Sequence, residues 1–444
     1  MKKHLTHVQV IILGYLIMVL LGTLLLALPF SSADGRSAGF LNSFFTAVSA
    51  SCVTGLIRLP TGGSWSFFGQ IVLLVLIQIG GLGFMTIATV FFLLINKQMR
   101  LSARETMVES LNLTRIDGIA RFSGKIVAGT LLFEGTGTAL LAIRFIPRFG
   151  LWRGLWLSLF HAVSAFCNAG FDLFNGAEAA PSLMLFHDDW LVCLTIILLI
   201  VIGGLGFLVW DDLRKHRFHW KKYSLHTKLV LVTSAVLLFG SAVLFLIFEA
   251  PAGQSAGTPL SAQILEALFS SATARTAGFN STDTAALSDA SKLLTVLLML
   301  IGGSPGSTAG GVKTTTVAVL VLSVFAAFRA EKKAAAFGRS IPQETVLKSL
   351  SVLLTNAGCA LTAAVAICAL EKLPALDVLF ETFSAIGTVG MSTGITAALR
   401  PFTACLIALL MFMGRVGSVS FSVALLEKKQ KLPLSYPEEE ITVG

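Results

Sequence analysis

The sequence predicts an all-α membrane protein made of four tandem units, each a helix, a re-entrant pore loop and a second helix, around a pseudo-fourfold pore. Composition is the first observation: 55% of the 444 residues are hydrophobic and 13% are charged, against about 25% charged residues in soluble domains. Apolar runs of about 17–25 residues, long enough to cross a bilayer, recur along the whole chain. In addition, one short stretch of sequence occurs four times.

The repeated stretch has the same layout in all four copies. Each copy has an apolar residue ten positions before a glycine and a small residue six positions before it. The copies cover residues 45–56, 160–171, 268–279 and 380–391, and their glycines are Gly55, Gly170, Gly278 and Gly390. These glycines lie 115, 108 and 112 residues apart. Glycine at one point in every copy indicates that backbone, and not side chains, faces a common axis.

Eight apolar segments are the predicted membrane spans. They cover residues 8–30, 67–95, 122–146, 188–210, 227–250, 290–328, 347–370 and 402–426, and the sixth is long and broken. Within each pair of spans lies a shorter stretch that holds one repeat: 38–56, 151–171, 259–279 and 374–391. Each stretch is too short to cross. We therefore expect a half-helix that returns as extended chain, which a membrane tolerates where the backbone is buried or lines a watery path.

The chain thus divides into four pore units, residues 1–97, 98–217, 218–333 and 334–444, the last with a cytoplasmic tail. Most of the 33 Lys and Arg residues lie between the units and at the two ends. The positive-inside rule then places both termini in the cytoplasm and the four loops outside, in a multi-pass protein of the cell membrane. The basic residues are dispersed without interleaved aromatic residues, which argues against nucleic-acid binding.

A second glycine motif lies in the second helix of each unit. Its copies are 80–83, 203–206, 302–305 and 414–417. Glycines in the first two copies allow close helix packing. In the third unit, five glycines and a proline within residues 302–311 cannot hold a regular helix. We expect a loop in mid-membrane that obstructs the axis, or, as the alternative, a mere kink in a transporter helix.

The loop at 302–316 is the predicted gate. Its candidate residues are Gly302, Gly303, Ser304, Gly306, Ser307, Thr308, Gly310, Gly311 and Lys313, together with Arg415 of the fourth unit. Arg415 stands where the second glycine of the motif is expected, and a charge near mid-bilayer is costly unless it meets water or a partner. On the axis it would raise the energy of a cation beside it; the alternative is a structural ion pair. We expect Arg275 to anchor the third loop through Glu134 or Glu381.

The four loops carry the predicted ion site. Rings of backbone carbonyls bind dehydrated monovalent cations by replacing hydration water. The candidate residues are Val53, Thr54, Gly55, Asn168, Ala169, Gly170, Thr276, Ala277, Gly278, Thr388, Val389 and Gly390. None of the loops offers the ring of Asp or Glu that a calcium-selective pore would carry. Four glycines favour K⁺ as the bound ion and leave passage of Na⁺ open.

Over nearly its whole length the chain resembles the Trk/Ktr/HKT superfamily of potassium transporters, closest to the KtrB-type membrane subunit. The resemblance rests on the four loop motifs, on Gly302–Gly311 and on Gly414-Arg415-Val416-Gly417. It implies a K⁺ filter, an intramembrane gate at 302–316 with Arg415 beneath the filter, and a homodimer on a cytosolic ring of nucleotide-binding RCK-type subunits. ATP or ADP would then act through that partner, with no cofactor on this chain, and Na⁺ activation stays open. Segments 96–121, 211–227 and 427–444 are candidate docking surfaces.

The mechanism we expect is passive K⁺ uptake driven by the membrane potential. A secondary transporter with broken helices, coupling K⁺ to Na⁺ as a symporter, is the main alternative. An intramembrane enzyme is the other. Ser164, His161 and Asp172 could serve as its catalytic groups, but the other copies of the repeat lack this combination. We therefore predict a protein that is not an enzyme.

Overall fold

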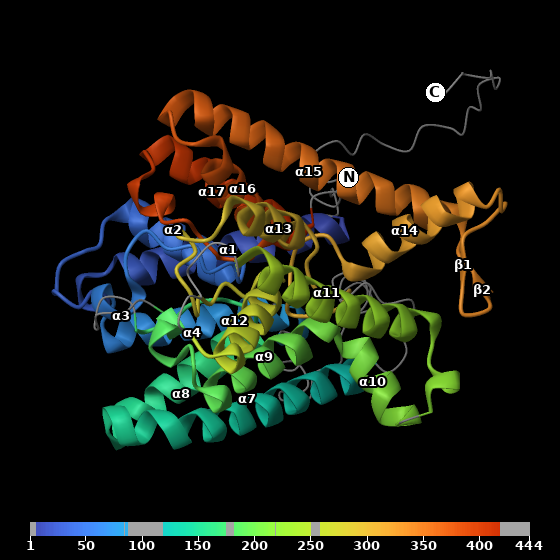
Figure 1. Cartoon of the computed structure of the whole chain (residues 1–444). Coiled ribbons are helices and arrows are strands. Elements are labelled where there is room, and N and C mark those ends of the chain that lie inside the picture. Colours follow the sequence, from blue (N-terminus) through green and yellow to red (C-terminus); the bar gives the residue numbers. More distant parts are fainter. Residues whose placement is uncertain are drawn as a thin grey trace, which may run out of the picture.

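The computed structural model describes residues 6–83, 85–87, 119–174, 182–217, 219–249 and 258–417, which are almost entirely helical (Figure 1). The helices are α1 (His7–Ala27), α2 (Phe40–Ser51), α3 (Thr61–Ser64), α4 (Phe67–Leu82), α7 (Ile119–Phe149), α8 (Leu151–Phe166), α9 (Trp190–Leu205), α10 (Phe207–His216), α11 (Leu225–Glu249), α12 (Leu260–Thr273), α13 (Asp289–Leu300), α14 (Thr314–Phe328), α15 (Gln343–Glu371), α16 (Ala375–Gly387) and α17 (Pro401–Val416). Short 3₁₀ helices lie at η1 (Pro29–Ser31), η2 (Ser182–Phe186), η3 (Trp220–Lys222) and η4 (Ile395–Ala398), and β1 (Ala335–Ala336) pairs with β2 (Arg339–Ser340) as an antiparallel hairpin.

Several helices start where a side chain satisfies their free backbone N–H groups. Thr6 forms a capping box with Gln9 at the start of α1. Ser66, Asp189 and Ser288 accept hydrogen bonds from the first turns of α4, α9 and α13. The predicted spans start within two residues of the helices that these caps begin.

Four described helices are long and apolar enough to cross a membrane, over Val8–Ala27, Arg121–Phe149, Leu225–Glu249 and Gln343–Glu371. They correspond to the first, third, fifth and seventh predicted spans. The predicted span 188–210 is not one straight helix, because α9 ends at Leu205 and α10 leaves it at an angle of 94°. The helix α10 therefore does not continue the direction of α9. The sixth span breaks between α13 and α14, as its glycines predict.

The second helix of three units ends at the same glycine of its motif. Gly83, Gly206 and Gly417 follow α4, α9 and α17 with φ angles of 80°, 94° and 98°. These φ values are accessible to glycine at little cost. The predicted spans 67–95 and 402–426 continue past these glycines into segments that lie largely outside the described residues.

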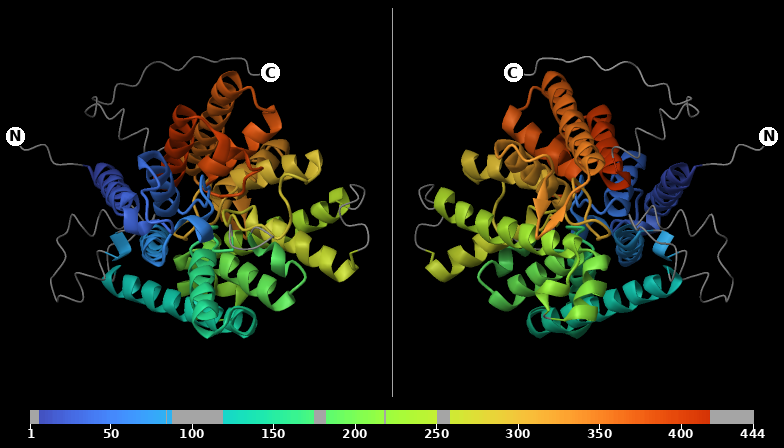
Figure 2. Two further views of the ribbon diagram at one scale, coloured as in Figure 1. Left: turned by 90° about the vertical axis from the view of Figure 1, so that its left-hand side faces the viewer. Right: turned by 90° about the vertical axis from the view of Figure 1, so that its right-hand side faces the viewer.

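The helices follow one another around a centre. In the left view of Figure 2, blue, teal, yellow-green and orange-red segments occupy successive sectors of the molecule. Each unit contacts the next through α4 with α8, α9 with α12 and α13 with α16, and α17 closes the circle against α2. The short helices α2, α8, α12 and α16 pack on the long helix of their own unit.

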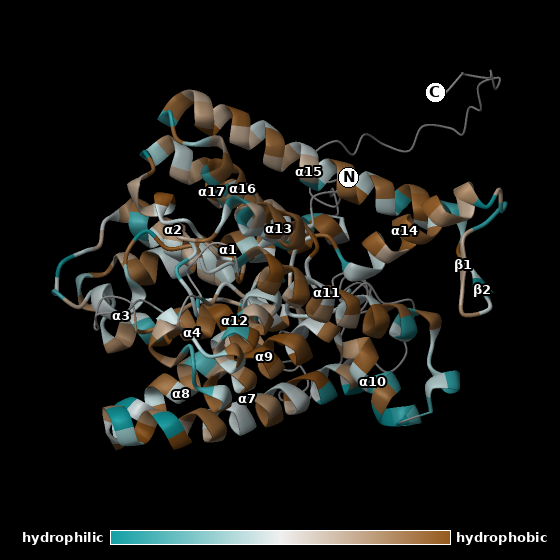
Figure 3. Cartoon of the chain, in the orientation of Figure 1, coloured by the Kyte–Doolittle hydropathy of each residue, from teal (hydrophilic) through white to brown (hydrophobic). Residues whose placement is uncertain are grey.

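Apolar side chains face outward on the long helices. Leu24, Leu132, Val236 and Leu354 have more than 60% of their surface exposed, and brown apolar residues line the outer helices in Figure 3. An exposed apolar surface of this extent is stable in lipid and not in water. The prediction of a mostly helical membrane protein is confirmed.

Candidate functional site

The four loop glycines lie in one closed ring. A Cβ atom added at Gly170 would lie 2.8 Å from the Cα of Gly278, and one added at Gly278 would lie 3.1 Å from the Cα of Gly390. The same addition at Gly390 would come within 3.0 Å of the Cα of Gly55, and at Gly55 within 3.2 Å of the Cα of Gly170. Each glycine thus faces the next unit, and the structure brings together the backbone that the repeat predicts at a common axis.

The backbone of the four loops repeats an unusual conformation. The φ angles of Gly55, Gly170, Gly278 and Gly390 are 95°, 67°, 78° and 92°. The residues two positions earlier, Val53, Asn168, Thr276 and Thr388, also have positive φ, between 52° and 69°. Positive φ is uncommon outside glycine and concentrates at functional sites. Positive φ on alternate residues turns successive carbonyls toward one side, in contrast to the alternation of a regular strand.

The backbone carbonyl oxygens of the twelve candidate residues accept no hydrogen bond from a backbone N–H group in the part of the chain that the structure describes. The first two residues of each candidate triplet, such as Val53 and Thr54, are at most 1% exposed. Buried carbonyls are nearly always hydrogen-bonded. A ring of unpaired carbonyls therefore offers its oxygens to a cation or to water.

The neighbouring carbonyl explains why each ring position is glycine. A Cβ at Gly170 would lie 2.6 Å from the carbonyl oxygen of Ala277. A Cβ at Gly278 would collide with the carbonyl oxygen of Val389 in the next unit. Any larger residue must therefore displace a carbonyl of the ring.

Serine hydroxyls brace two of the loops. The carbonyl of Ser49 accepts from the N–H of Thr54 at 2.8 Å, and its hydroxyl accepts from the N–H of Gly55 at 3.0 Å. Ser384 repeats this pattern with Gly390, whose N–H donates to the hydroxyl at 3.1 Å. The repeat predicts a small residue here; the bracing role emerges only from the structure.

The other two loops are braced at their far end. The hydroxyl of Ser164 donates to the carbonyl of Phe171 at 2.8 Å. The third copy has Ala272 at the small position, and the next residue, Thr273, donates to the carbonyl of Phe279 at 2.7 Å. A one-residue shift of the hydroxyl thus preserves the brace.

The glycine-rich segment between α13 and α14 forms a loop held by the second unit. Its two ends meet at Ile301 and Val312, where the N–H of Gly302 donates to the carbonyl of Val312 at 2.8 Å. The N–H of Ser304 donates to the carbonyl of Gly204 at 2.9 Å, and Phe207 donates to the carbonyl of Gly306 at 2.8 Å. The second-unit motif 203–206 therefore supplies backbone partners for the loop, beyond the helix packing expected of it.

This loop lies directly against the start of the candidate triplets. The hydroxyl of Thr308 donates to the carbonyl of Phe166 at 3.0 Å, two residues before Asn168. A Cβ at Gly310 would collide with the hydroxyl of Thr388, and one at Gly311 would lie 3.0 Å from the carbonyl oxygen of Gly387. The predicted gate residues and the predicted ion-binding residues are thus in contact.

Arg415 ties the loop to the first unit. One terminal nitrogen donates to the carbonyl of Thr308, and the other donates to the carbonyls of Gly80 and, at 3.0 Å, Gly81. Its Nε donates to the hydroxyl of Tyr15 at 3.4 Å. The described partners of Arg415 are carbonyl and hydroxyl oxygens, in place of the carboxylate that the ion-pair alternative requires.

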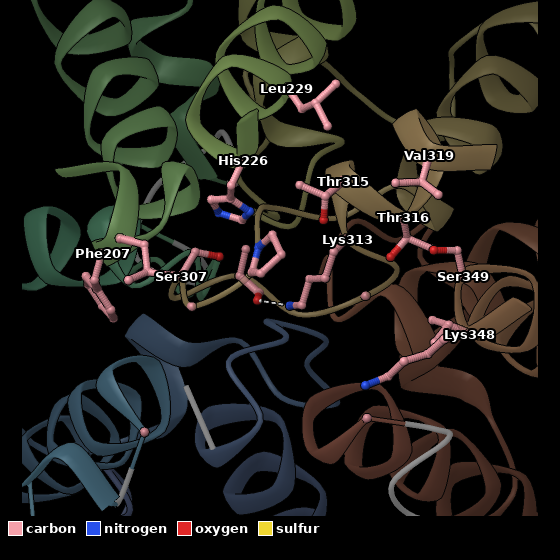
Figure 4. A pocket seen from close by; sticks show the side chains of 18 of the residues that line it. Phe207, His226, Leu229, Ser307, Lys313, Thr315, Thr316, Val319, Lys348 and Ser349 are labelled. Atoms are coloured by element: carbon pink, nitrogen blue, oxygen red, sulfur yellow. Dashed lines mark hydrogen bonds between the residues drawn. The ribbon is translucent and has the colours of Figure 1, made fainter. Parts of the chain in front are cut away.

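Lys313 folds back on the loop that it ends. Its Nζ donates to the carbonyls of Ala309 at 2.8 Å and Gly310 at 3.3 Å. Figure 4 shows this side chain between Thr315 and Lys348 in a cavity of about 1330 Å³. Loop residues line the cavity, and none of the twelve triplet residues does. The loop therefore separates the glycine ring from the cavity.

The predicted anchor of Arg275 is wrong. Its guanidinium donates to the carbonyl and the hydroxyl of Ser234 on α11, both at 3.3 Å. Glu134 accepts from Gln78 at 3.3 Å instead, and Glu381 accepts from residues of its own unit. The oxygens that accept from Arg275 belong to Ser234 on the long helix of the same unit, 41 residues earlier in the sequence.

Comparison with known proteins gives a consistent picture. A family model described as TrkH, cation transport protein, matches residues 5–432. The chain is 40% identical over 450 residues to the potassium/sodium uptake protein NtpJ of Enterococcus hirae, covering 100% of this chain and 98% of that protein. It is 37% identical over 441 residues to the Ktr system potassium uptake protein B of Bacillus subtilis, covering 99% and 97%.

A solved structure has the same fold. The crystal structure of the potassium transporter TrkH from Vibrio parahaemolyticus matches with a TM-score of 0.70 at 19% identity, over 96% of this chain and 86% of that one. The matched family and the similar proteins are transport proteins. The prediction of a transport protein, as opposed to an enzyme, is confirmed.

Proposed function

This chain belongs to the TrkH family of cation transport proteins, and from that premise we propose that it takes up K⁺ through the ring of four loop glycines. The observation that carries the proposal is the closed ring of Gly55, Gly170, Gly278 and Gly390 with its unpaired carbonyls. Carbonyl rings of this kind replace the hydration shell of a monovalent cation. The names of the similar proteins, potassium uptake and potassium/sodium uptake, support K⁺ as the transported ion.

The architecture that we propose has eight transmembrane helices and four re-entrant loops around this ring. The element order supports it, since a long helix, a short helix and a further helix follow one another four times. The ring would then lie on the extracellular side of the glycine-rich loop. Both termini would lie in the cytoplasm, as the positive-inside rule requires.

Uptake would be passive and driven by the membrane potential. Moving one positive charge inward through 100 mV releases about 2.3 kcal/mol. No nucleotide-binding segment is needed on this chain for such a mechanism, and ATP or ADP would act through a partner subunit.

The glycine-rich loop and Arg415 would form the gate. Arg415 holds Thr308 of the loop to Gly80 and Gly81 of the first unit. Opening would require these contacts to break, so that the loop leaves the path between ring and cavity. A loop with two arrangements is the kind of bistable element that a regulatory partner can bias.

A cytosolic ring of RCK-type subunits would be that partner, and the membrane subunit would be a homodimer. The name Ktr system, borne by a similar protein, supports more than one component. Of the candidate docking segments, 211–227 is described apart from residue 218, whereas 96–118 and 427–444 lie outside the described residues.

Symport of K⁺ with Na⁺ is a second candidate function. The name potassium/sodium uptake protein, carried by a similar protein, favours it. Uptake of a Rb⁺ tracer into K⁺-loaded proteoliposomes distinguishes a passive K⁺ pore from K⁺/Na⁺ symport. A passive pore predicts uptake that follows the imposed potential without Na⁺ and that K⁺ competes away. Strict dependence on Na⁺, with a fixed ratio of the two ions, would establish symport; absence of protein-dependent Rb⁺ uptake would exclude both.

A further inference from the structure

The position nine residues before each ring glycine differs between the four units. It is occupied by Thr46, His161, Phe269 and Glu381. All four side chains lie on short helices and are at most 2% exposed. The fourth unit is thus the one whose short helix places a carboxylate behind the ring. A buried carboxylate in a membrane protein is costly unless every oxygen has partners.

The partners of Glu381 come from the chain that follows the ring. Its Oε1 accepts from the hydroxyl of Ser392 and from the N–H of Thr393 at 3.2 Å. Its Oε2 accepts from the hydroxyl of Thr396 at 2.6 Å. Among the described residues Glu381 has no cationic partner in an ion pair. Segment 392–396 therefore supplies a hydrogen-bond donor to each oxygen of the carboxyl group.

This segment begins two residues after Gly390. The Ser392 oxygen also accepts from the N–H of Gly394 at 2.8 Å, which closes a local turn. Further along, the carbonyl of Leu399 accepts from Arg58 of the first unit at 2.9 Å. The chain that leaves the fourth ring glycine is therefore fixed at two points, by Glu381 of its own short helix and by Arg58 of the neighbouring first unit.

Gly390 has little freedom if it is to keep the ring closed. A Cβ there would collide with the carbonyl oxygen of Thr54, so the two backbones already touch. A shift of segment 392–396 would move Gly390 relative to the first unit and change the size of the ring. Discrimination between K⁺ and the smaller Na⁺ depends on how the carbonyls hold their positions and number around the ion.

We propose that Glu381 is a positioning residue for ion selection: by holding segment 392–396 it fixes Gly390 and sets the preference for K⁺ over Na⁺. The inference rests on the proposed function, because it presupposes that the ring binds the ion. Glu381 acts through Ser392, Thr393 and Thr396 and has no described contact with the ring carbonyls.

The test measures the ratio of K⁺ to Na⁺ uptake by full-length protein in proteoliposomes, for the wild type and four variants. E381A removes the carboxylate, E381Q keeps its shape with one acceptor oxygen, and T396V removes one donor with little change of volume. E371Q is the matched control. Glu371 is a carboxylate of the same unit that accepts from the N–H of Arg400 and the hydroxyl of Thr403, at the start of α17 and after segment 392–396.

The expected result is a graded loss of selectivity. We expect the preference for K⁺ to fall about tenfold in E381A, the effect of losing the hydrogen bonds that hold segment 392–396, and by smaller factors in E381Q and T396V. E371Q should retain the wild-type ratio. A purely structural role would lower the yield of folded protein and leave the ratio unchanged.

Two results would overturn the inference. One is a wild-type ratio of K⁺ to Na⁺ uptake in both T396V and E381Q when these variants fold at normal yield. This result can be obtained even if E381A does not fold. The other is an equal loss of selectivity in E371Q. A wild-type protein that takes up Rb⁺ with no preference for K⁺ over Na⁺ would instead refute the proposed K⁺ filter, and the role of Glu381 with it.

Discussion

At the residue scale, the ring glycines lie where a side chain does not fit. Gly278 combines a φ angle of 78° with the carbonyl of Val389 at the site of its missing Cβ. Conformational strain and collision therefore act together. Glycine is needed here for two reasons: a side chain would displace the carbonyl of Val389, and the backbone of residue 278 adopts a positive φ angle.

Replacing Gly278 by serine should reduce the preference for K⁺ over Na⁺ by about tenfold, because its Cβ would displace a ring carbonyl and a non-glycine residue at this φ costs on the order of 1–3 kcal/mol. The ratio of K⁺ to Na⁺ uptake in proteoliposomes measures this. Gly35 provides a control with a φ angle of 70° and nothing within 4 Å of an added Cβ. G35S should keep the wild-type ratio; an unchanged ratio in G278S would exclude Gly278 from ion selection.

Asp212 offers a test at a second residue, on α10 and outside the membrane-spanning segments. Burial alone raises its pKa, but hydrogen bonds from Thr227, Ser224 and His216 outweigh that effect and lower the pKa to about 2. A carboxyl with a depressed folded-state pKa stabilises the fold above its unfolded pKa of about 3.9 and loses that contribution as pH falls toward the folded value.

D212N should therefore lower the free energy of unfolding by about 1 kcal/mol at pH 7, and the difference from the wild type should shrink as the pH falls below about 4. Thermal unfolding in detergent at a series of pH values measures both. D211N is the control, since Asp211 pairs with the exposed side chains of Lys125 and Lys215. Equal loss in both variants at every pH would show that the Asp212 network contributes nothing specific.

At this scale, the sequence predicts where a residue lies when the same residue type recurs in all four copies of the repeat. The four glycines and the small residue six positions before each can be aligned without any structure. Arg275 and Arg415 show the limit: each occurs once, and their partners, Ser234 and the carbonyls of Thr308 and Gly80, come from distant segments. Side-chain partners of single buried charges are decided by tertiary packing, which local pattern does not contain.

At the element scale, the loop between α13 and α14 shows how composition determines a break in a helix. Five glycines and a proline predict the break, and the helices end at Leu300 and resume at Thr314. The partners of the loop could not be predicted in the same way. Gly203 and Gly204 contribute backbone carbonyls to it, although their motif reads as simple helix packing.

Releasing this loop should increase ion flux. R415Q replaces the guanidinium that joins Thr308 to Gly80 and Gly81 by a shorter amide that cannot reach both sides. We expect Rb⁺ uptake without a partner subunit to rise severalfold, in line with the loss of about 1 kcal/mol of closing contacts. The initial rate in proteoliposomes is the measurement. R400Q is the control, because the Arg400 side chain is 72% exposed and pairs with Glu371.

Shortening the loop provides an independent check of the gate. A variant lacking residues 304–310 loses the contacts to Gly204, Phe166 and Arg415 while α13 and α14 remain. Uptake should rise and should depend less on the regulatory subunit. Flux equal to the wild type in both this variant and R415Q would remove the loop from the ion path.

At the scale of the whole molecule, four similar units enclose the ring and differ below and behind it. The loop residues that form the ring have similar φ angles, burial and contacts with the next unit in all four units. The third and fourth units depart from the repeat through the glycine-rich loop, Arg415 and Glu381. This arrangement separates ion selection, which benefits from symmetry, from control, which requires one unit to differ.

The order of helices and the position of the loops follow from hydropathy and the repeat, since both are properties of contiguous sequence. The bend of 94° after α9 could not be predicted in this way. In the sequence, Gly206 looks no different from Gly203 and Gly204, which read as helix-packing glycines. The boundaries 1–97, 98–217, 218–333 and 334–444 remain predictions.

The most direct test of the central claim is a crystal structure of the protein soaked in Rb⁺, with anomalous scattering used to locate the ion. The account predicts an anomalous peak on the axis between Gly55, Gly170, Gly278 and Gly390, within about 3 Å of the carbonyls that replace its hydration shell. Anomalous density confined to the cavity on the other side of the glycine-rich loop, with none in the ring, would contradict it.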